Sequence, residues 1–345
     1  MTAQVAILGV GMITGVGSTA AASCAAIRCG VNNFNETHFL DLYGEKIVAS
    51  AVRLDQPWRG LTKLAKMAAS AVQECLEAMA KVPKAGAALP LVLVIAEEDR
   101  PGRLPGLGGP LLLSIERELG MKVHPDSSVV AQGRVGGAVG LLRAQKLMEE
   151  RGHAHVVLCG VDTFLTGPTL SMFDERERLL TSHNSNGFIP GEAAAAVLLG
   201  RDDAGEACSV ACTGMGFARE PATIESDKPL RAGGMTQAIR AALAAAGIGL
   251  EQVDYRISDL SGEQYRFKEV TLATTRIRRD HRVGFGIWHP ADCIGEVGAA
   301  ALPSMLGVLY SGARKRYLPG PIFLAYLSND DDKRSALVLS TRERG

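Results

Sequence analysis

The sequence predicts an α/β protein in two similar halves, each built on a mixed, mainly parallel sheet that is covered by helices. Strand-like and helix-like segments alternate along the chain, which is typical of parallel sheets with helical crossovers. The same order of strand, turn and helix starts again after residue 208. The 345 residues exceed an average domain, and 47% apolar residues with 39 glycines indicate a large aliphatic core with close helix–sheet packing.

In the first half, aliphatic runs predict buried strands, and apolar residues at helical spacing predict helices. The first strand is expected to end in a turn at Gly9 and Gly11. Strands are expected at 5–8, 91–96, 155–160 and 193–200, and helices at 18–28, 62–81 and 135–151.

The second half repeats this order, with a turn expected at Gly214 and Gly216. Strands are expected at 209–217, 253–260, 321–327 and 336–340, and helices at 234–247 and 295–310. Glu97 and Asp259 both follow a predicted strand and lie 162 positions apart, the same separation as that between Gly133 and Gly295. The repeat predicts an internal duplication with halves at 1–204 and 205–345, joined by a charged linker near 201–206.

Three segments are rich in turn formers or charges and longer than ordinary connections. Long loops of this kind cover active sites or form dimer contacts in many proteins. They are residues 32–58, 101–110 and 170–186.

Composition argues against several classes of protein. Lys+Arg and Asp+Glu both number 37, so no basic excess favours a nucleic acid or an acidic membrane as partner. No apolar run reaches the roughly 18–20 residues that span a bilayer. The first residues lack the basic start of a signal peptide, and seven scattered cysteines without CxxC pairs fit reduced thiols. A cytoplasmic location is expected.

The chain resembles the β-ketoacyl synthases of the thiolase superfamily over nearly its whole length. The order and spacing of several segments carry the resemblance, although no single segment is specific. They are Gly9-Val-Gly11-Met-Ile-Thr14-Gly-Val-Gly17, Phe173-Asp-Glu-Arg-Glu-Arg, Gly187-Phe-Ile-Pro-Gly-Glu192, residues 241–255, Gly295-Glu-Val-Gly298 and Leu327-Ser-Asn329. The resemblance implies a thiolase-like fold with α/β/α/β/α layers, and a homodimer or heterodimer.

Members of that family join acyl units with a cysteine at a helix N-terminus, assisted by two histidines. The helix dipole and backbone N–H groups lower the pKa of such a thiol and hold the oxyanion. Here Gln132 stands at the nucleophile position, or Gly133 or Arg134 if the register is shifted. Asp259 and Glu296 stand at the two histidine positions. Ordinary condensing chemistry is therefore not expected.

Two further departures lie near these positions. Ala291 takes the place of the family's lysine, and Asn329 opens an acidic run, Asp330 to Asp332, that replaces a glycine-rich loop. The acidic run is expected to be a solvated loop. Chain-length-factor subunits of aromatic polyketide synthases are a precedent, because they resemble ketoacyl synthases, replace the cysteine, usually by glutamine, and work beside an active sister.

If the fold holds, the substituted residues should converge in one place. One interpretation is a pocket for a polar ligand or acid–base chemistry, and the other is a salt-bridge cluster that fills a dead site. A pocket open to a pantetheine-sized tunnel would favour the enzyme, whereas a pocket filled by Arg134 and bulky side chains would favour a partner subunit or an adaptor. The candidates for catalysis are Asp259, Glu296 and Cys293, and those for the pocket are Gln132, Arg134, Glu263 and Asn329.

The predicted function is that of a non-catalytic partner subunit, a pseudoenzyme that binds a cysteine-bearing synthase-like sister, an acyl thioester or an acyl carrier protein. An acyltransferase or thioester enzyme with an altered site, and a structural adaptor that uses the dimer surface, are the alternatives. No cofactor is expected, because the Gly9 to Gly17 segment lacks the dinucleotide spacing. No metal is expected either, because no third ligand clusters with His153 and His155 in the sequence.

Overall fold

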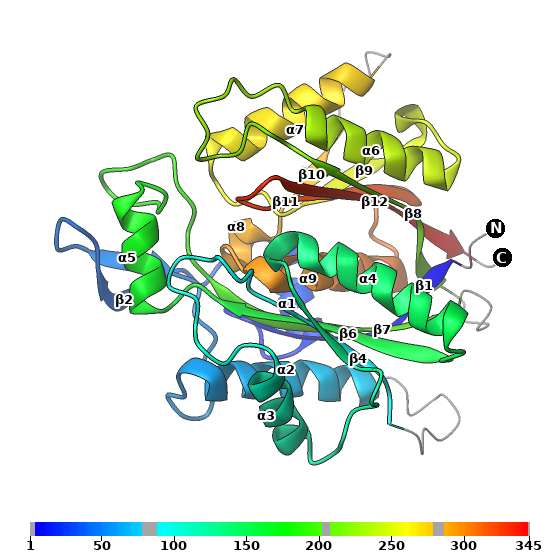
Figure 1. Ribbon diagram of the computed structural model, residues 1–345, viewed down its shortest axis with the longest axis horizontal. Helices are drawn as coiled ribbons and strands as arrows, with labels where there is room; N and C mark the ends of the chain where they lie inside the picture. The colour runs from blue at the N-terminus through cyan, green and yellow to red at the C-terminus, as the bar shows by residue number, and fades with distance from the viewer. Residues whose placement is uncertain (1–3, 78–87, 202–207, 279–285, 344–345) are drawn as a thin grey trace.

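The computed structural model describes residues 4–77, 88–201, 208–278 and 286–343. Its helices and strands form five layers, and Figure 1 shows them stacked as helices, sheet, helices, sheet and helices. The α/β fold with these layers is as predicted.

The two sheets have the same strand order when the strands of each sheet are numbered along the chain. The first has the order β5-β4-β6-β7-β1 and the second the order β10-β9-β11-β12-β8. The first comprises β1 (Val5–Thr14), β4 (Leu91–Ile95), β5 (Ser128–Ala131), β6 (His155–Thr163) and β7 (Glu192–Arg201). The second comprises β8 (Cys208–Arg219), β9 (Tyr255–Ser258), β10 (Ile287–Trp288), β11 (Ile322–Ser328) and β12 (Lys333–Glu343).

Both sheets are mixed, and among the described strands only β7 and β12 oppose the direction of the others in their sheet. Residues Val5 to Ile7 of β1 pair antiparallel with Val210 to Cys212 of β8, which joins the two sheets. Glu97 follows β4 and Asp259 follows β9, two strands with the same place in their sheets. A duplication with a boundary at 204/205 stays a prediction, and the linker at 202–206 lies outside the described residues.

Helices cover both outer faces and fill the space between the sheets (Figure 1). α2 and α3 lie on one outer face, α6 and α7 on the other, and α4 and α9 between the sheets. Separate apolar clusters occupy these three spaces. The helices are α1 (Ala20–Arg28), α2 (Gly60–Glu77), α3 (Gly109–Leu119), α4 (Gly133–Glu150), α5 (Gly167–Glu175), α6 (Gly233–Ala246), α7 (Gln264–Ile277), α8 (Ala291–Ile294) and α9 (Ala301–Arg314). No helix among the described residues is long and apolar enough to cross a membrane.

The turns predicted at the paired glycines are wrong, because both strands run through them. β1 continues to Thr14, and a Cβ on Gly11 would lie 1.9 Å from the carbonyl oxygen of Ala71 in α2. A Cβ on Gly214 in β8 would likewise lie 2.2 Å from the carbonyl oxygen of Ala242 in α6. These glycines therefore let a helix approach a strand closely, and they do not reverse the chain.

The helix predicted at 295–310 starts later than expected. Gly295 and Gly298 have positive φ angles of 71° and 49°, which interrupt the helical path between α8 and α9. Glu296 lies between them in an isolated bridge with Pro190. This break places the Glu296 side chain at the interface between the two halves.

Two of the predicted long loops contain regular structure. Residues 32–58 include a hairpin of β2 (Asn35–Leu40) and β3 (Lys46–Ala49), and the segment at 170–186 begins inside α5. Neither has the long apolar periodicity by which the other elements were found. The last residues of the helix predicted at 62–81, beyond Glu77, lie outside the described residues.

Candidate functional site

The site is centred on the turn from β5 into α4. Gln132 is the N-cap residue of α4, and its side chain makes no capping hydrogen bond. Gly133 follows with a φ of +52°, in the left-handed region that favours glycine. A Cβ on Gly133 would also lie 2.1 Å from Oε2 of Glu97. The backbone of the turn therefore favours glycine, and a side chain at this position would have to displace the carboxylate of Glu97.

Arg134 lies in the first turn of α4 and is 2% exposed. Its Nη2 forms an ion pair with Oε2 of Glu296 at 2.9 Å, and its Nη1 donates to Oδ1 of Asp330 at 3.0 Å. Burial acts to lower the pKa of this guanidinium, but the two carboxylates outweigh it and hold the pKa well above the usual range. Arg134 is therefore a fixed, paired charge.

Asp330 is the hub of the cluster, and its contacts contradict the solvated loop that the sequence predicts for 330–332. It accepts hydrogen bonds from Arg134, Arg178 and Arg266, with 2.8 Å between its Oδ2 and Nη1 of Arg178. Its side chain is only 22% exposed. Burial acts to raise its pKa, but the three guanidinium groups hold it well below the usual range.

Glu263 joins two of these arginines from the opposite side. Nε and Nη2 of Arg178 donate to its two carboxylate oxygens at 2.7 and 2.9 Å, and Nε of Arg266 donates at 3.2 Å. This bidentate geometry is the strong form of an arginine–carboxylate pair. Arg178 follows α5 and Arg266 lies in α7, so Glu263 ties the first half to the second.

Glu296 is fully paired as well. Its Oε1 accepts the backbone N–H of Gly298 and its Oε2 the hydroxyl of Ser261, both at 2.8 Å. Burial acts to raise its pKa, but Arg134, Arg266 and the N–H of Gly298 lower it below the usual value. Glu296 is therefore ionised at neutral pH.

Asp259 is also buried, but its pKa is shifted in the opposite direction to that of Glu296. Its Oδ2 accepts the backbone N–H of Ser328 at 2.9 Å. Burial raises its pKa to about 6, against the opposing effect of Arg266 and Arg134. Asp259 and Glu296 line a cavity of about 20 Å³, which has room for about one water molecule.

The side chain of Asn329 makes two hydrogen bonds to the backbone at the N-terminus of α4. Its Oδ1 accepts the backbone N–H of Val135 at 3.0 Å, and its Nδ2 donates to the carbonyl oxygen of Gln132 at 3.0 Å. The free N–H groups of a helix N-terminus are what would hold an oxyanion. In this chain, Asn329 already uses one of them.

Cys293 does not join this cluster. It lies in α8, and its Sγ is 3.9 Å from the carbonyl oxygen of Ile27. It lines a separate cavity of about 210 Å³ with Trp288 and Tyr317, and burial raises the pKa of its thiol. A thiol with a raised pKa is a poor nucleophile at neutral pH.

A second buried cluster lies beside the first, and sequence reasoning missed it. Arg100 donates to Glu97 and to Asp162, both at 2.7 Å, and stacks on the ring of Phe164 at 4.3 Å. Asp162 also accepts the backbone N–H of Ala299 at 2.8 Å. Glu97 and Asp162 lie at the ends of two adjacent strands, β4 and β6. Acidic residues at these two strand ends were the sequence feature from which the cluster could have been predicted.

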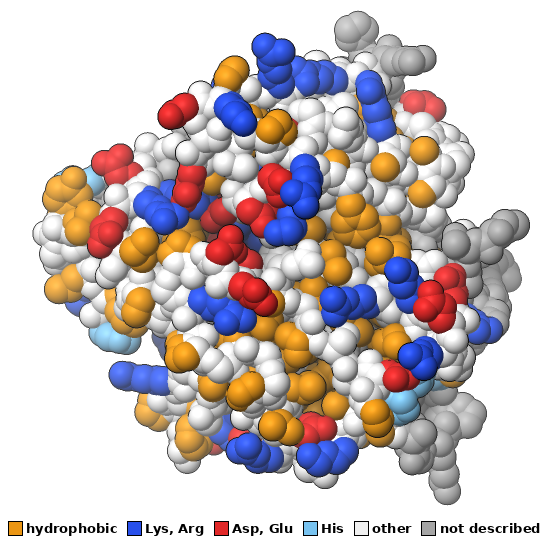
Figure 2. Space-filling view, viewed as in Figure 1, with side chains coloured by type: hydrophobic (Ala, Val, Ile, Leu, Met, Phe, Trp, Pro, Cys, Tyr) orange, Lys and Arg blue, Asp and Glu red, His pale blue; other side chains and the backbone are white. Residues whose placement is uncertain are grey.

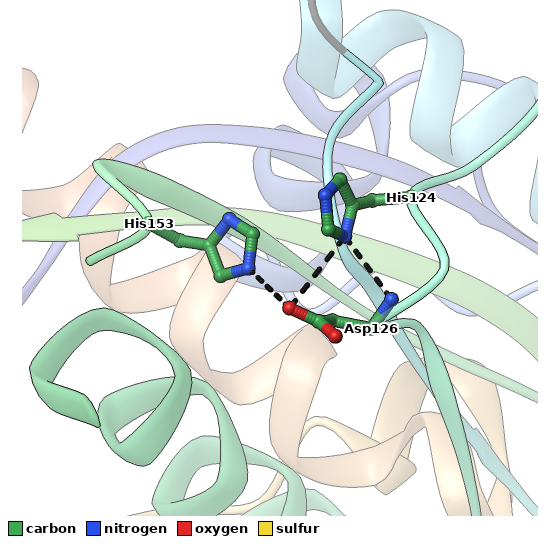
Figure 3. Close-up of side chains that lie close together, drawn as sticks. All are labelled: His124, Asp126 and His153. Carbon is green, nitrogen blue, oxygen red and sulfur yellow. Dashed lines mark hydrogen bonds and ion pairs between the residues drawn. The ribbon is translucent and has the colours of Figure 1, made fainter. Parts of the chain in front are cut away.

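Outside the site, the structure brings His153 together with two side chains that are distant in the sequence. His155 begins β6, whereas His153 lies against His124 and Asp126, as Figure 3 shows. His153 and His155 therefore have different neighbours, because His153 lies in the loop before β6 whereas His155 is the first residue of the strand.

The arrangement described around α4 is suited to holding elements together. Its charges pair with one another, and no cysteine of the described residues lies among them. In Figure 2, acidic and basic side chains lie side by side across the middle of the face in view.

Neither protein-family profiles nor curated proteins match the sequence. Solved structures do match. A ketosynthase (ApeO) in complex with its chain length factor (ApeC) from Xenorhabdus doucetiae aligns with a TM-score of 0.78 at 15% identity, covering 99% of this chain and 98% of that one. The ishigamide ketosynthase/chain length factor aligns at 0.77 and 16% identity, covering 99% of both chains.

A third structure is a type II polyketide synthase acyl-carrier protein in complex with its ketosynthase bound to the hexaketide. It aligns with a TM-score of 0.79 at 15% identity and covers 99% of this chain and 100% of that chain. The strand order, the layers and these alignments together show that the chain has the thiolase-like fold of ketosynthases and chain length factors.

Proposed function

We propose that the chain is a non-catalytic partner subunit of a ketosynthase-like protein. The observation that carries the proposal is the filled site at the start of α4. Arg134 pairs with Glu296 and Asp330 where a condensing enzyme of this fold needs an open reaction chamber. The adjoining cavity of about 20 Å³ has no room for a pantetheine arm or an acyl chain.

The turn into α4 supports the same proposal. In enzymes with a nucleophile elbow, the nucleophile lies on a strained strand-to-helix turn, and the left-handed residue of the turn into α4 is Gly133. A larger residue there would collide with Glu97. On this geometry we place the lost nucleophile at Gly133, one residue after the Gln132 position that the resemblance favours.

One sheet edge offers a surface for a partner. β5 ends the sheet, and the carbonyl oxygen of Val129 in this strand accepts a hydrogen bond from Arg143. An open edge strand favours pairing with another strand. α3 and the turn after it precede this strand, and their side chains Leu113 and Met121 are 50% and 40% exposed. We assign this edge to a ketosynthase-like sister that keeps its cysteine.

Co-purification of the tagged chain from its native lysate tests the proposal. A stoichiometric ketosynthase is the expected partner, and a self-dimer with no such protein would contradict it. Leu113→Asp with Met121→Asp should weaken the complex by at least about tenfold, because buried charge without a partner is costly in an interface. Phe267→Asp, at a side chain that is 38% exposed on α7 and lies on the opposite outer face (Figure 1), is the matched control.

A thioester enzyme with an altered site is the second candidate. Asp259, whose pKa is about 6, has the value of a general acid or base near neutral pH, and it lies beside Glu296. Acyl-thioester hydrolysis that the purified chain performs and Asp259→Asn abolishes would favour this candidate. A structural adaptor would instead still bind its partner after Asp259 or Glu296 is replaced.

A further inference from the structure

Three side chains that could bind a metal ion converge at the edge of the first sheet, outside the site described above. His124 and Asp126 lie in the segment before β5, and His153 lies in the loop between α4 and β6 (Figure 3). Nε2 of His153 is 2.7 Å from Oδ2 of Asp126, and Nδ1 of His124 is 3.7 Å from the same oxygen. The loops before β5 and β6 therefore meet through these side chains.

We propose that His124, Asp126 and His153 form a binding site for a divalent transition-metal ion, with Zn²⁺ as the representative. Two imidazole nitrogens and one carboxylate oxygen are a ligand set that Zn²⁺ and Co²⁺ accept, with water completing the shell. Tetrahedral bonds of about 2.0–2.1 Å place neighbouring ligand atoms about 3.3 Å apart. The three ligand atoms lie within 4.8 Å of one another, so small side-chain rotations bring them into range.

The protonation state of the cluster suits a metal. The backbone N–H of Asp126 donates to Nδ1 of His124 at 3.0 Å, so this nitrogen carries a lone pair. A bound ion would be coordinated by this lone pair, in place of the hydrogen bond from Asp126.

Access and charge also fit an exchangeable ion. The side chains of His124, Asp126 and His153 are 33%, 31% and 17% exposed, so an ion reaches them from solvent. Arg151 lies near enough to act on Asp126 electrostatically and opposes a cation. The site is therefore expected to bind more weakly than a buried structural zinc site. The metal site does not depend on the proposed partner function.

The test uses the full chain after treatment with EDTA. Titration with ZnCl₂ by calorimetry, and with CoCl₂ by absorbance, measures affinity and stoichiometry. We expect one ion per chain, and a loss of affinity of at least about tenfold for His124→Ala or His153→Ala. The Co²⁺ spectrum should lack a thiolate charge-transfer band, because no cysteine is among the ligands. His155→Ala, two residues from His153 and outside the cluster, is the matched control.

A second readout guards against variants that fold poorly. Zn²⁺ should raise the melting temperature of the wild type and of His155→Ala, because an ion bound only to the native state stabilises it. Asp126→Asn keeps the shape of the side chain, retains its melting temperature without metal, and should lose that increase. Equal binding by the wild type, His153→Ala and Asp126→Asn would overturn the proposal, as would an absence of binding to the wild type.

Discussion

Arg134 and Glu296 form an ion pair at 2.9 Å between two positions where the resemblance places the nucleophile region and the second histidine of a condensing enzyme. Both side chains are 2% exposed. Each of the two charges is therefore buried against the other. The ion pair connects α4 to the loop before α9.

Arg134→Met should lower the free energy of unfolding by about 3–5 kcal/mol, because it leaves Glu296 and part of Asp330 buried without their partner. Urea denaturation followed by circular dichroism measures the change. Lys146→Met, at an exposed position of the same helix, should stay within about 0.5 kcal/mol of the wild type. Similar stabilities for the two variants would mean that the ion pair contributes little to the fold.

Gly133→Ala tests the turn that we assign to the lost nucleophile. Gly152 is the matched control, because its φ is +72° and nothing lies within 4 Å of a Cβ built there. Gly152→Ala should cost only the backbone term, about 1 kcal/mol. Gly133→Ala carries the same term and the collision with Glu97 at 2.1 Å, so we expect a loss of at least about 2 kcal/mol. Equal losses in urea denaturation would show that Glu97 moves aside freely.

Much of the fold could be predicted from local pattern, because strands buried on both faces need continuous aliphatic runs. β4 and β7 coincide with such runs to within one residue. The glycines at 9–11 and 214–216 misled the prediction, because a turn and a close helix contact use the same residue. Only tertiary structure separates these two roles.

The site was predictable only where the resemblance supplied a register. Arg134, Asp259 and Glu296 lie together, but the partners Arg178 and Arg266 come from distant segments without a motif of their own. Asp330 was misread because a run of acidic residues is usually solvated. Three arginines from separate elements surround it, and no local pattern reports that arrangement.

Asp259 gives the fold a pH dependence of opposite sign to that of Glu296 and Asp330. Its folded pKa of about 6 lies above the unfolded value of about 3.9, so the native state binds the extra proton between these values. Stability from this group is therefore full below about pH 4 and falls as pH rises to about 6. The two other carboxylates, with lowered pKa values, contribute stability at higher pH and lose it in acid.

Asp259→Asn isolates this contribution, because Asn keeps an oxygen that can accept the N–H of Ser328. Arg134, Arg266, Glu296 and Asp330 are present in both proteins, so their titration largely cancels in the difference. The stability of the variant relative to the wild type should rise by up to about 3 kcal/mol between pH 4 and pH 7. Urea denaturation at several pH values measures it. A difference that does not change with pH would mean that Asp259 is ionised in the native protein, held so by Arg134 and Arg266.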